Sequence, residues 1–209
     1  MPKLIEHEND HLEDAYGVVL PEKKYPPLKK LKKKYEPSAH GHKTWNSSYN
    51  IMDYLLYHPM PRGSRVLEIG CGWGPASVFC ARKFGAKVTG LDIDPNVFPF
   101  LDLVAGLNDV KVAHLVSNYK KLTREQLQEF DIIIGSDVCF WDKLVKPLAD
   151  LSQRALDAGV KRVIVADPGR PTFYSMVERM RKKAKVELHD WYAMDPDFFQ
   201  GDVVEFRSK

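Results

Sequence analysis

Three glycines and one acid in this sequence have the types and spacing needed to hold a nucleoside. The stretch "VLEIGCGWG" places a glycine at every second position, at Gly70, Gly72 and Gly74. Glycine permits a positive φ and removes the Cβ that would keep a ligand away from the main chain. Asp92 follows eighteen residues after Gly74, and its two carboxylate oxygens match the vicinal hydroxyls of a ribose. The spacing predicts a nucleoside site.

The same loop argues against a phosphate-binding site. Dinucleotide sites prefer G-x-G-x-x-G, whereas this loop is G-x-G-x-G, and no G-K-[ST] of a P-loop follows. Glu68, two residues before the first glycine, would repel a pyrophosphate and suits a ligand that carries an ammonium group. The alternative is a plain turn between a strand and a helix, which needs only one glycine.

A second group of candidates lies where later strands should end. Ligands of open α/β sheets bind outside the carboxyl ends of the strands, which brings "GSDVCFW" to the cleft. Asp137 there could orient an amine, while Phe140 and Trp141 could wall a channel and offer π faces to a cation. The alternative is that Asp137 caps the next helix and both aromatic residues are core. In "DPGRP" the Pro-Gly pair suits a type II turn, which leaves Asp167 and Arg170 as candidate substrate contacts.

Alternating strands and helices must position these groups. Apolar residues at helical spacing separate seven predicted strands, which indicates a sheet covered by helices on both faces. The last two strands are joined by an irregular stretch, so we expect them to pair antiparallel. The prediction is an α/β, Rossmann-like, doubly wound, mostly parallel sheet in a three-layer αβα arrangement, with an antiparallel C-terminal hairpin strand. The predicted strands are residues 65–70, 87–93, 110–117, 130–137, 162–167, 185–193 and 203–207.

Composition and charge narrow the class of protein. The chain of 209 residues suffices for one core, and 44% hydrophobic with 28% charged residues is typical of a globular protein. No apolar run could span a bilayer and the polar start lacks a signal-peptide core, so we expect a cytoplasmic protein that does not engage membranes. The three cysteines lack metal-type spacing and are expected to be reduced. His40 and His42 have no carboxylate or cysteine partners in their neighbourhood, so no metal is expected.

The basic charge is local. Residues 23–36 hold seven lysines and one acid, a net +6, which leaves −3 for the rest of a chain whose total is +3. We expect residues 1–43 to form a basic, proline-containing extension with a short helix near residues 28–35, and residues 44–209 to form the main domain. We favour two interpretations of this basic segment, a solvent-exposed face or a docking surface for an acidic protein, over a nucleic-acid-binding site.

These motifs carry a family resemblance. "VLEIGCGWG" together with "VTGLDID" resembles the first two motifs of the class I, seven-strand S-adenosylmethionine-dependent methyltransferases, from about residue 45 to the C-terminus. The resemblance implies S-adenosylmethionine as cofactor, S-adenosylhomocysteine as product and no metal. It places Glu68 near the methionine amino group, Asp92 on the ribose and Asn118 near the adenine. The implied cofactor-binding residues are Trp45, Glu68, Gly70, Cys71, Gly72, Gly74, Asp92, Ile93, Asn118 and Ser136.

The acceptor side resembles one subgroup. The D-x-x-F element from Asp137 to Phe140, and "KTWNSS" upstream, are similar to the protein-lysine methyltransferases, and "DPGRP" looks like bacterial enzymes that methylate electron-transfer flavoprotein. The resemblance implies Asp137 and Phe140 as catalytic residues, with substrate contacts from Trp141, Asp167 and Arg170. Since a lysine amine must lose its proton before it attacks, we expect Asp137 to orient the amine and not to act as a strong base.

Four functions stay open at this point. The leading prediction is methyl transfer to a nitrogen, with a protein lysine as acceptor and a monomer or weak dimer as the working form. The alternatives are a small metabolite amine, a nucleic acid held by the basic arm, and a catalytically silent binding module. Nucleic acid is less favoured, because "SDVCFW" stands where enzymes acting on adenine or cytosine nitrogens show [DNS]-P-P-[YFW].

Overall fold

The core of the fold is a seven-stranded sheet with the strand order β5-β4-β3-β6-β7-β9-β8. The computed structural model describes residues 11–38 and 40–209. Five strands run parallel, while β9 is antiparallel to both β7 and β8, which confirms the predicted architecture and the C-terminal hairpin. The bounds are β3 Arg65–Ile69, β4 Lys87–Asp92, β5 Val112–Val116, β6 Ile132–Ser136, β7 Arg162–Asp167, β8 Lys185–Ala193 and β9 Phe199–Arg207.

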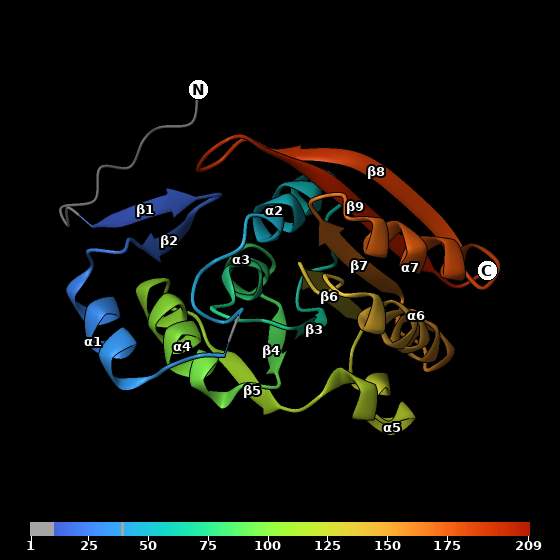
Figure 1. Ribbon diagram of the computed structural model, residues 1–209, viewed down its shortest axis with the longest axis horizontal. Helices are drawn as coiled ribbons and strands as arrows, with labels where there is room; N and C mark the ends of the chain where they lie inside the picture. The colour runs from blue at the N-terminus through green and yellow to red at the C-terminus, as the bar shows by residue number, and fades with distance from the viewer. Residues whose placement is uncertain (1–10, 39) are drawn as a thin grey trace.

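Helices cover both faces of this sheet (Figure 1). Side chains alternate along a strand, so Val66 of β3 faces one core cluster and Leu67 the other. The first cluster includes buried residues of α2, α3 and α4, and the second those of α5, α6 and α7. The bounds are α2 Ser47–Tyr57, α3 Pro75–Phe84, α4 Phe98–Leu107, α5 Arg124–Gln128, α6 Asp142–Asp157 and α7 Pro171–Arg181, with 3-10 turns η1 Pro95–Val97 and η2 Tyr119–Lys121.

The N-terminal region packs on the first face. A hairpin of β1 (Leu12–Ala15) and β2 (Val18–Pro21) precedes helix α1 (Pro26–Lys34), and the sequence analysis did not predict the hairpin. Ala15, Val18 and Leu20 of the hairpin and Leu28 of α1 are buried in the same cluster as α2, α3 and α4. The predicted basic helix is confirmed, and the extension contributes to the main core. Residues 1–10 of the predicted extension lie outside the described residues.

Local signals explain some helix ends and not others. Thr123 accepts the backbone N–H of Gln126 and the Gln126 side chain accepts that of Thr123, so a capping box begins α5. Helix α2 instead begins after Asn46 without a side-chain cap, and the Ser48 hydroxyl donates to the Trp45 carbonyl.

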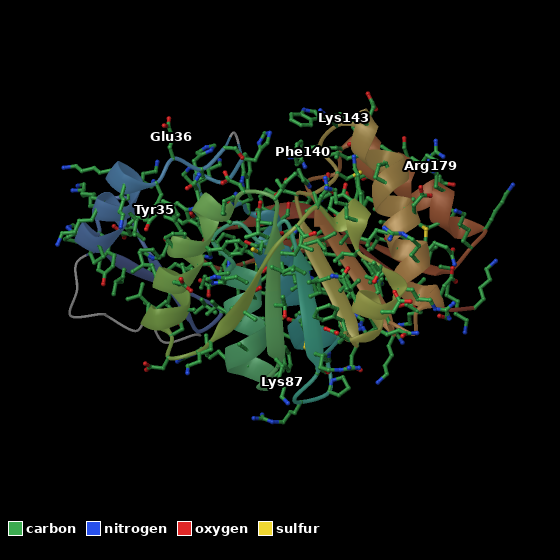
Figure 2. All side chains as sticks on the ribbon, turned by 90° about the horizontal axis from the view of Figure 1, so that it is seen from below. Tyr35, Glu36, Lys87, Phe140, Lys143 and Arg179 are labelled. Carbon is green, nitrogen blue, oxygen red and sulfur yellow. The ribbon has the colours of Figure 1, made fainter. Side chains whose placement is uncertain are left out.

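The parallel strands direct their carboxyl ends to one edge of the sheet. Figure 2 shows Lys87, the first residue of β4, at one edge, and Phe140, which follows β6, at the other. The loops after β3, β4, β5, β6 and β7 therefore meet at the Phe140 edge. Among the residues described, no helix is both long and apolar enough to cross a membrane.

Candidate functional site

A cavity of about 500 Å³ opens at the carboxyl edge of the sheet. Most of the predicted site residues line it, although they come from six separate segments of the chain. Gly74 and Asp167 do not line it. The predicted residues in its wall are Trp45, Glu68, Gly70, Cys71, Gly72, Asp92, Ile93, Asn118, Ser136, Asp137, Phe140, Trp141 and Arg170.

The glycines of the loop after β3 serve different purposes. All three adopt a positive φ, between 51° and 65°. A Cβ at Gly74 would lie 2.1 Å from Leu101 Cδ1 of α4, so this glycine allows two helices to pack. A Cβ at Gly70 would lie 2.9 Å from Val138 Cγ1, whereas one at Gly72 would meet nothing within 4 Å. Gly72 is thus the position where the bare main chain borders open space.

Two carboxylates stand on either side of this loop. Glu68 of β3 is almost fully buried and accepts the Ser77 N–H at 3.0 Å and the Ser77 hydroxyl at the start of α3. Burial raises the pKa of Glu68 to about 7. Asp92, at the end of β4, accepts the N–H groups of Gly72 at 3.1 Å and Asp94 at 3.0 Å, and burial raises its pKa as well. A positive charge entering the cavity would favour the ionised form of both acids.

The next two strand ends supply an apolar surface and a polar turn. Ile93 is 66% exposed, although it is a large apolar side chain in the cavity wall. Asn118 caps the η2 turn, because its Oδ1 accepts the Lys120 N–H at 3.0 Å. The Tyr119 hydroxyl is buried and has no hydrogen-bond partner among the described residues, and burial raises its pKa to about 12. The sequence analysis missed Tyr119, which gives no signal beyond its place after a strand.

Asp137 is held by an arginine and does not cap a helix. Its φ of 56° is left-handed, a conformation that non-glycine residues adopt rarely, and its N–H donates to the Ala166 carbonyl of β7 at 3.0 Å. Arg170 Nη1 lies 2.7 Å from Asp137 Oδ1 and 2.9 Å from Asp167 Oδ2. Helix α6 begins after Trp141, which excludes the capping alternative for Asp137.

Asp167 also pairs with Arg170 but does not line the cavity. Its side chain is fully buried, and its Oδ1 accepts the N–H groups of Gly169 at 3.1 Å and Arg170 at 2.8 Å. Burial raises the pKa of Asp167, while the Arg170 guanidinium opposes that rise. Of these two candidate substrate contacts, Arg170 lines the cavity, whereas Asp167 does not and instead holds Arg170 in position.

The chain between α1 and α2 runs along the mouth of the cavity, where it contributes Ser38, His40, Gly41 and Lys43 to the wall. The Ser38 N–H donates to the Asp94 carboxylate, and Trp73 of the glycine loop donates its Nε1–H to the Gly41 carbonyl at 2.9 Å. A Cβ on Gly41 would lie 2.7 Å from Val97 Cγ1, so this backbone packs closely on η1. The segment is anchored to the loops that follow β3 and β4.

Aromatic rings from both sides meet at this mouth. The His40 ring lies 4.4 Å from Phe140, 5.5 Å from Trp141 and 6.0 Å from Trp45, measured between ring centroids. Phe140 and Trp141 are 4.7 Å apart in an edge-on arrangement. His40 was considered in the sequence only as a metal ligand, and no spacing rule links it to residues a hundred positions away.

Comparison with known proteins agrees with this geometry. Residues 66–159 match a family model described as a methyltransferase domain. The magnesium protoporphyrin IX methyltransferase of Synechocystis, solved with bound S-adenosylhomocysteine, superposes with a TM-score of 0.59 over 93% of this chain and 91% of that one, at 11% identity. The chain therefore has the fold of the class I methyltransferases, and residues 66–159 are similar to a methyltransferase domain. The predicted recognition is confirmed, and the glycine loop and β4 acid of this methyltransferase domain lie within the matched residues.

Curated relatives share part of the methyltransferase domain. The electron transfer flavoprotein beta subunit lysine methyltransferase of Xenopus laevis is 27% identical over 149 residues, which cover 70% of this chain and 60% of that protein. The histidine protein methyltransferase 1 homolog of Dictyostelium discoideum is 31% identical over 127 residues, covering 58% of this chain and 41% of that protein. The chain thus spans about half the length of these relatives.

Proposed function

We propose that this protein transfers a methyl group from S-adenosylmethionine to a nitrogen atom of a protein side chain, with lysine as the first candidate. The observation that carries the proposal is a single cavity that joins Glu68, Gly72 and Asp92 at one end to Asp137 and Phe140 at the other. One end suits a charged nucleoside and the other an amine. The similarity to relatives named for protein lysine and protein histidine methylation supports a protein acceptor.

The chemistry of the donor set fits the cofactor. Gly72 leaves open space at the loop, Asp92 offers two oxygens for ribose hydroxyls, and the exposed Ile93 provides an apolar surface for a base. Glu68, with its raised pKa, is suited to a partner that carries an ammonium group. When bound, S-adenosylmethionine supplies a methyl group on a positively charged sulfur, which leaves as a neutral thioether once a nitrogen lone pair takes the methyl.

At the acceptor end, Asp137 orients the incoming nitrogen. Two carboxylates, Asp137 and Asp167, share one Arg170, which leaves a net charge of −1 beside the cavity when all three are ionised. This charge attracts an ammonium group from solvent, and the guanidinium keeps the Asp137 carboxylate in one position. Once the ammonium group has released one proton to water, Asp137 accepts a hydrogen bond from the neutral amine and aligns its lone pair, so Asp137 need not take that proton itself.

The aromatic mouth sets the width of the approach. Phe140, Trp141 and His40 pack against one another around the opening, so a slender side chain can enter where a bulky one cannot. Their ring faces are attractive to a cation. The His40 ring is one of the lining groups of the cavity that an incoming cation would meet.

A labelling experiment tests the proposal. Tritiated S-adenosylmethionine is added to a cell extract with the protein, and counts are followed into protein, nucleic acid and small-molecule fractions. We expect the label in protein, and mass spectrometry of the labelled band to place it on a lysine side chain. Label confined to small molecules or to nucleic acid would contradict the proposed acceptor, and no incorporation together with no cofactor binding by calorimetry would contradict the proposed activity.

A further inference from the structure

The structure assigns a docking surface for an acidic protein segment to four lysines, one in the wall of the cavity and three beside it. This lysine collar consists of Lys32, Lys34, Lys43 and Lys143. The inference rests on the proposed protein acceptor and adds the chemistry by which that acceptor is recognised: carboxylates that flank the residue to be methylated.

Each collar lysine is held over an aromatic ring. The distances from Nζ to the ring centroid are 4.2 Å for Lys43 over Trp45 and for Lys143 over Trp141. They are 5.1 Å for Lys32 over Trp73 and 5.2 Å for Lys34 over Tyr35. These are all the cation–π pairs in the part of the chain that the structure describes, and three of the four rings line the cavity.

This arrangement orders the ammonium groups without neutralising them. Within residues 11–38 and 40–209, the lysines that pair with carboxylates are Lys146 and Lys161, and neither belongs to the collar. Burial together with the nearby Lys23 ammonium lowers the pKa of Lys32, as expected where positive charge is in excess. A ring fixes a lysine side chain in advance, so less rotamer entropy is lost when an acidic partner binds.

The collar lies on the same side of the molecule as the cavity. Figure 2 shows Lys143 next to Phe140 at the carboxyl edge, and Glu36, which follows α1, also on that side. Lys43 belongs to the segment that runs along the mouth and itself lines the cavity. A partner whose side chain reaches Asp137 therefore comes close to Lys43 and Lys143.

Protein is favoured over nucleic acid as the occupant. Binding of single-stranded nucleic acid uses aromatic faces as stacking platforms, and one face of each collar ring is already covered by a lysine. The acids Glu36 and Asp142 also interrupt the positive surface, which a continuous phosphate backbone would not tolerate well. An acidic protein segment places its charges at intervals and can avoid both.

The test compares collar and control variants in a binding assay that needs no turnover. The probe is a short fluorescent peptide with a central lysine between glutamates, and its anisotropy is measured with the protein saturated by S-adenosylhomocysteine. Reference probes carry glutamine or arginine in place of glutamate, and a single-stranded RNA serves as the nucleic-acid probe. The collar variant is Lys34→Glu with Lys43→Glu and Lys143→Glu.

The matched control has the same change in charge at the opposite edge. It combines Lys87→Glu, Lys111→Glu and Lys185→Glu, exposed residues at the amino ends of β4, β5 and β8. We expect the collar variant to lose at least about tenfold in affinity for the acidic peptide, since each charged contact contributes up to roughly fivefold. The control should stay within about twofold. A glutamine version of the collar variant, checked by thermal unfolding, should show a smaller loss and guards against misfolding.

Three results would overturn the inference. The first is equal affinity for the glutamate and glutamine peptides, and the second is an equal loss of affinity in the collar and control variants. The third is RNA that binds more tightly than the acidic peptide and loses its affinity in the collar variant. Failure of the proposed function is distinguishable, because it would abolish tritium transfer to protein while collar-dependent peptide binding persisted. Loss of the peptide's preference with transfer intact would reject the collar alone.

Discussion

Replacement of Glu68 by glutamine should stabilise the ligand-free protein and weaken its cofactor site. The carboxyl group is buried and its pKa is raised from the ordinary 4.5 to about 7. A group whose pKa is higher in the folded state binds its proton more tightly there, so folding is favoured at low pH. That stability is lost as the pH rises through the folded pKa. Glu68→Gln removes this loss because glutamine does not titrate.

The magnitude follows from the pKa. Each pKa unit corresponds to about 1.4 kcal/mol. The rise from 4.5 to about 7 therefore lowers the free energy of unfolding by about 3 kcal/mol once the pH is above the pKa of the folded state. The free energy of unfolding of Glu68→Gln minus that of the unchanged protein should therefore increase from near zero at about pH 4.5 to about 3 kcal/mol at about pH 8. The Ser77 hydroxyl can still donate to the amide oxygen, so this contact need not be lost.

Urea unfolding at several pH values measures this difference. The control is Glu129→Gln, the same substitution at an exposed glutamate at the end of α5, and the pH dependence at Glu68 is measured against it. A flat difference for Glu68→Gln, or one that falls as the pH rises, would refute the claim that Glu68 titrates near neutrality in the folded protein.

Ligand affinity gives an independent measure of the same carboxylate. Below about pH 7 the amino group of S-adenosylhomocysteine stays protonated, so the titrating partner is Glu68. If the ligand's ammonium requires an ionised Glu68, affinity should rise about tenfold between pH 5.5 and pH 7. Calorimetry on Glu68→Gln should show weaker binding without this rise, and a persistent rise would assign it to another group.

Three further changes probe the loop and the acceptor end. Asp92→Ala should weaken S-adenosylhomocysteine binding by roughly tenfold to a hundredfold through lost hydroxyl hydrogen bonds, with calorimetry as the measurement and equal affinity as the contradicting result. Asp137→Asn should keep that affinity within about twofold but reduce kcat about a hundredfold, because the amine is no longer aligned; unchanged turnover would remove Asp137 from this role. Gly74→Ala should destabilise the fold by about 2 kcal/mol, since the new Cβ meets Leu101 at 2.1 Å, whereas thermal unfolding of Gly72→Ala should show a smaller loss.

The sheet and the glycine loop were predictable because their signals are local. The first six predicted strands agree with the observed ones to within two residues at each end, and β7 and β8 agree at both ends. β9 begins at Phe199, four residues earlier than predicted, because its ladder with β8 continues to the Ala193–Phe199 pair. No periodicity in the irregular stretch marks that extension, which depends on the partner strand.

The N-terminal hairpin and the ion pair at Asp137 were missed for different reasons. Tyr16 and Gly17 form a two-residue turn with both φ values positive, but Tyr-Gly is not one of the dipeptides that mark such a turn in a sequence, and the prolines and lysines nearby suggested an extension. The pairing of Asp137 with Arg170 joins two loops thirty-three residues apart, and only the packing of β6 beside β7 brings them together. The residue types were recognised; their mutual arrangement needed the folded sheet.

Three carboxylates in one cavity are given different chemistry by their surroundings. Burial raises the pKa of Glu68 to about 7 although the Ser77 hydroxyl and N–H groups donate to it, so a positively charged ligand would decide whether Glu68 is ionised. Asp92 accepts hydrogen bonds from two backbone N–H groups, and its remaining lone pairs are available to the hydroxyl groups of a ligand. Asp137 is paired with Arg170, which holds its carboxylate in place. If Glu68 and Asp137 exchanged surroundings, the arginine would no longer hold the acid at the acceptor end in place. The proposed function therefore depends on where each acid lies and not on how many acids there are.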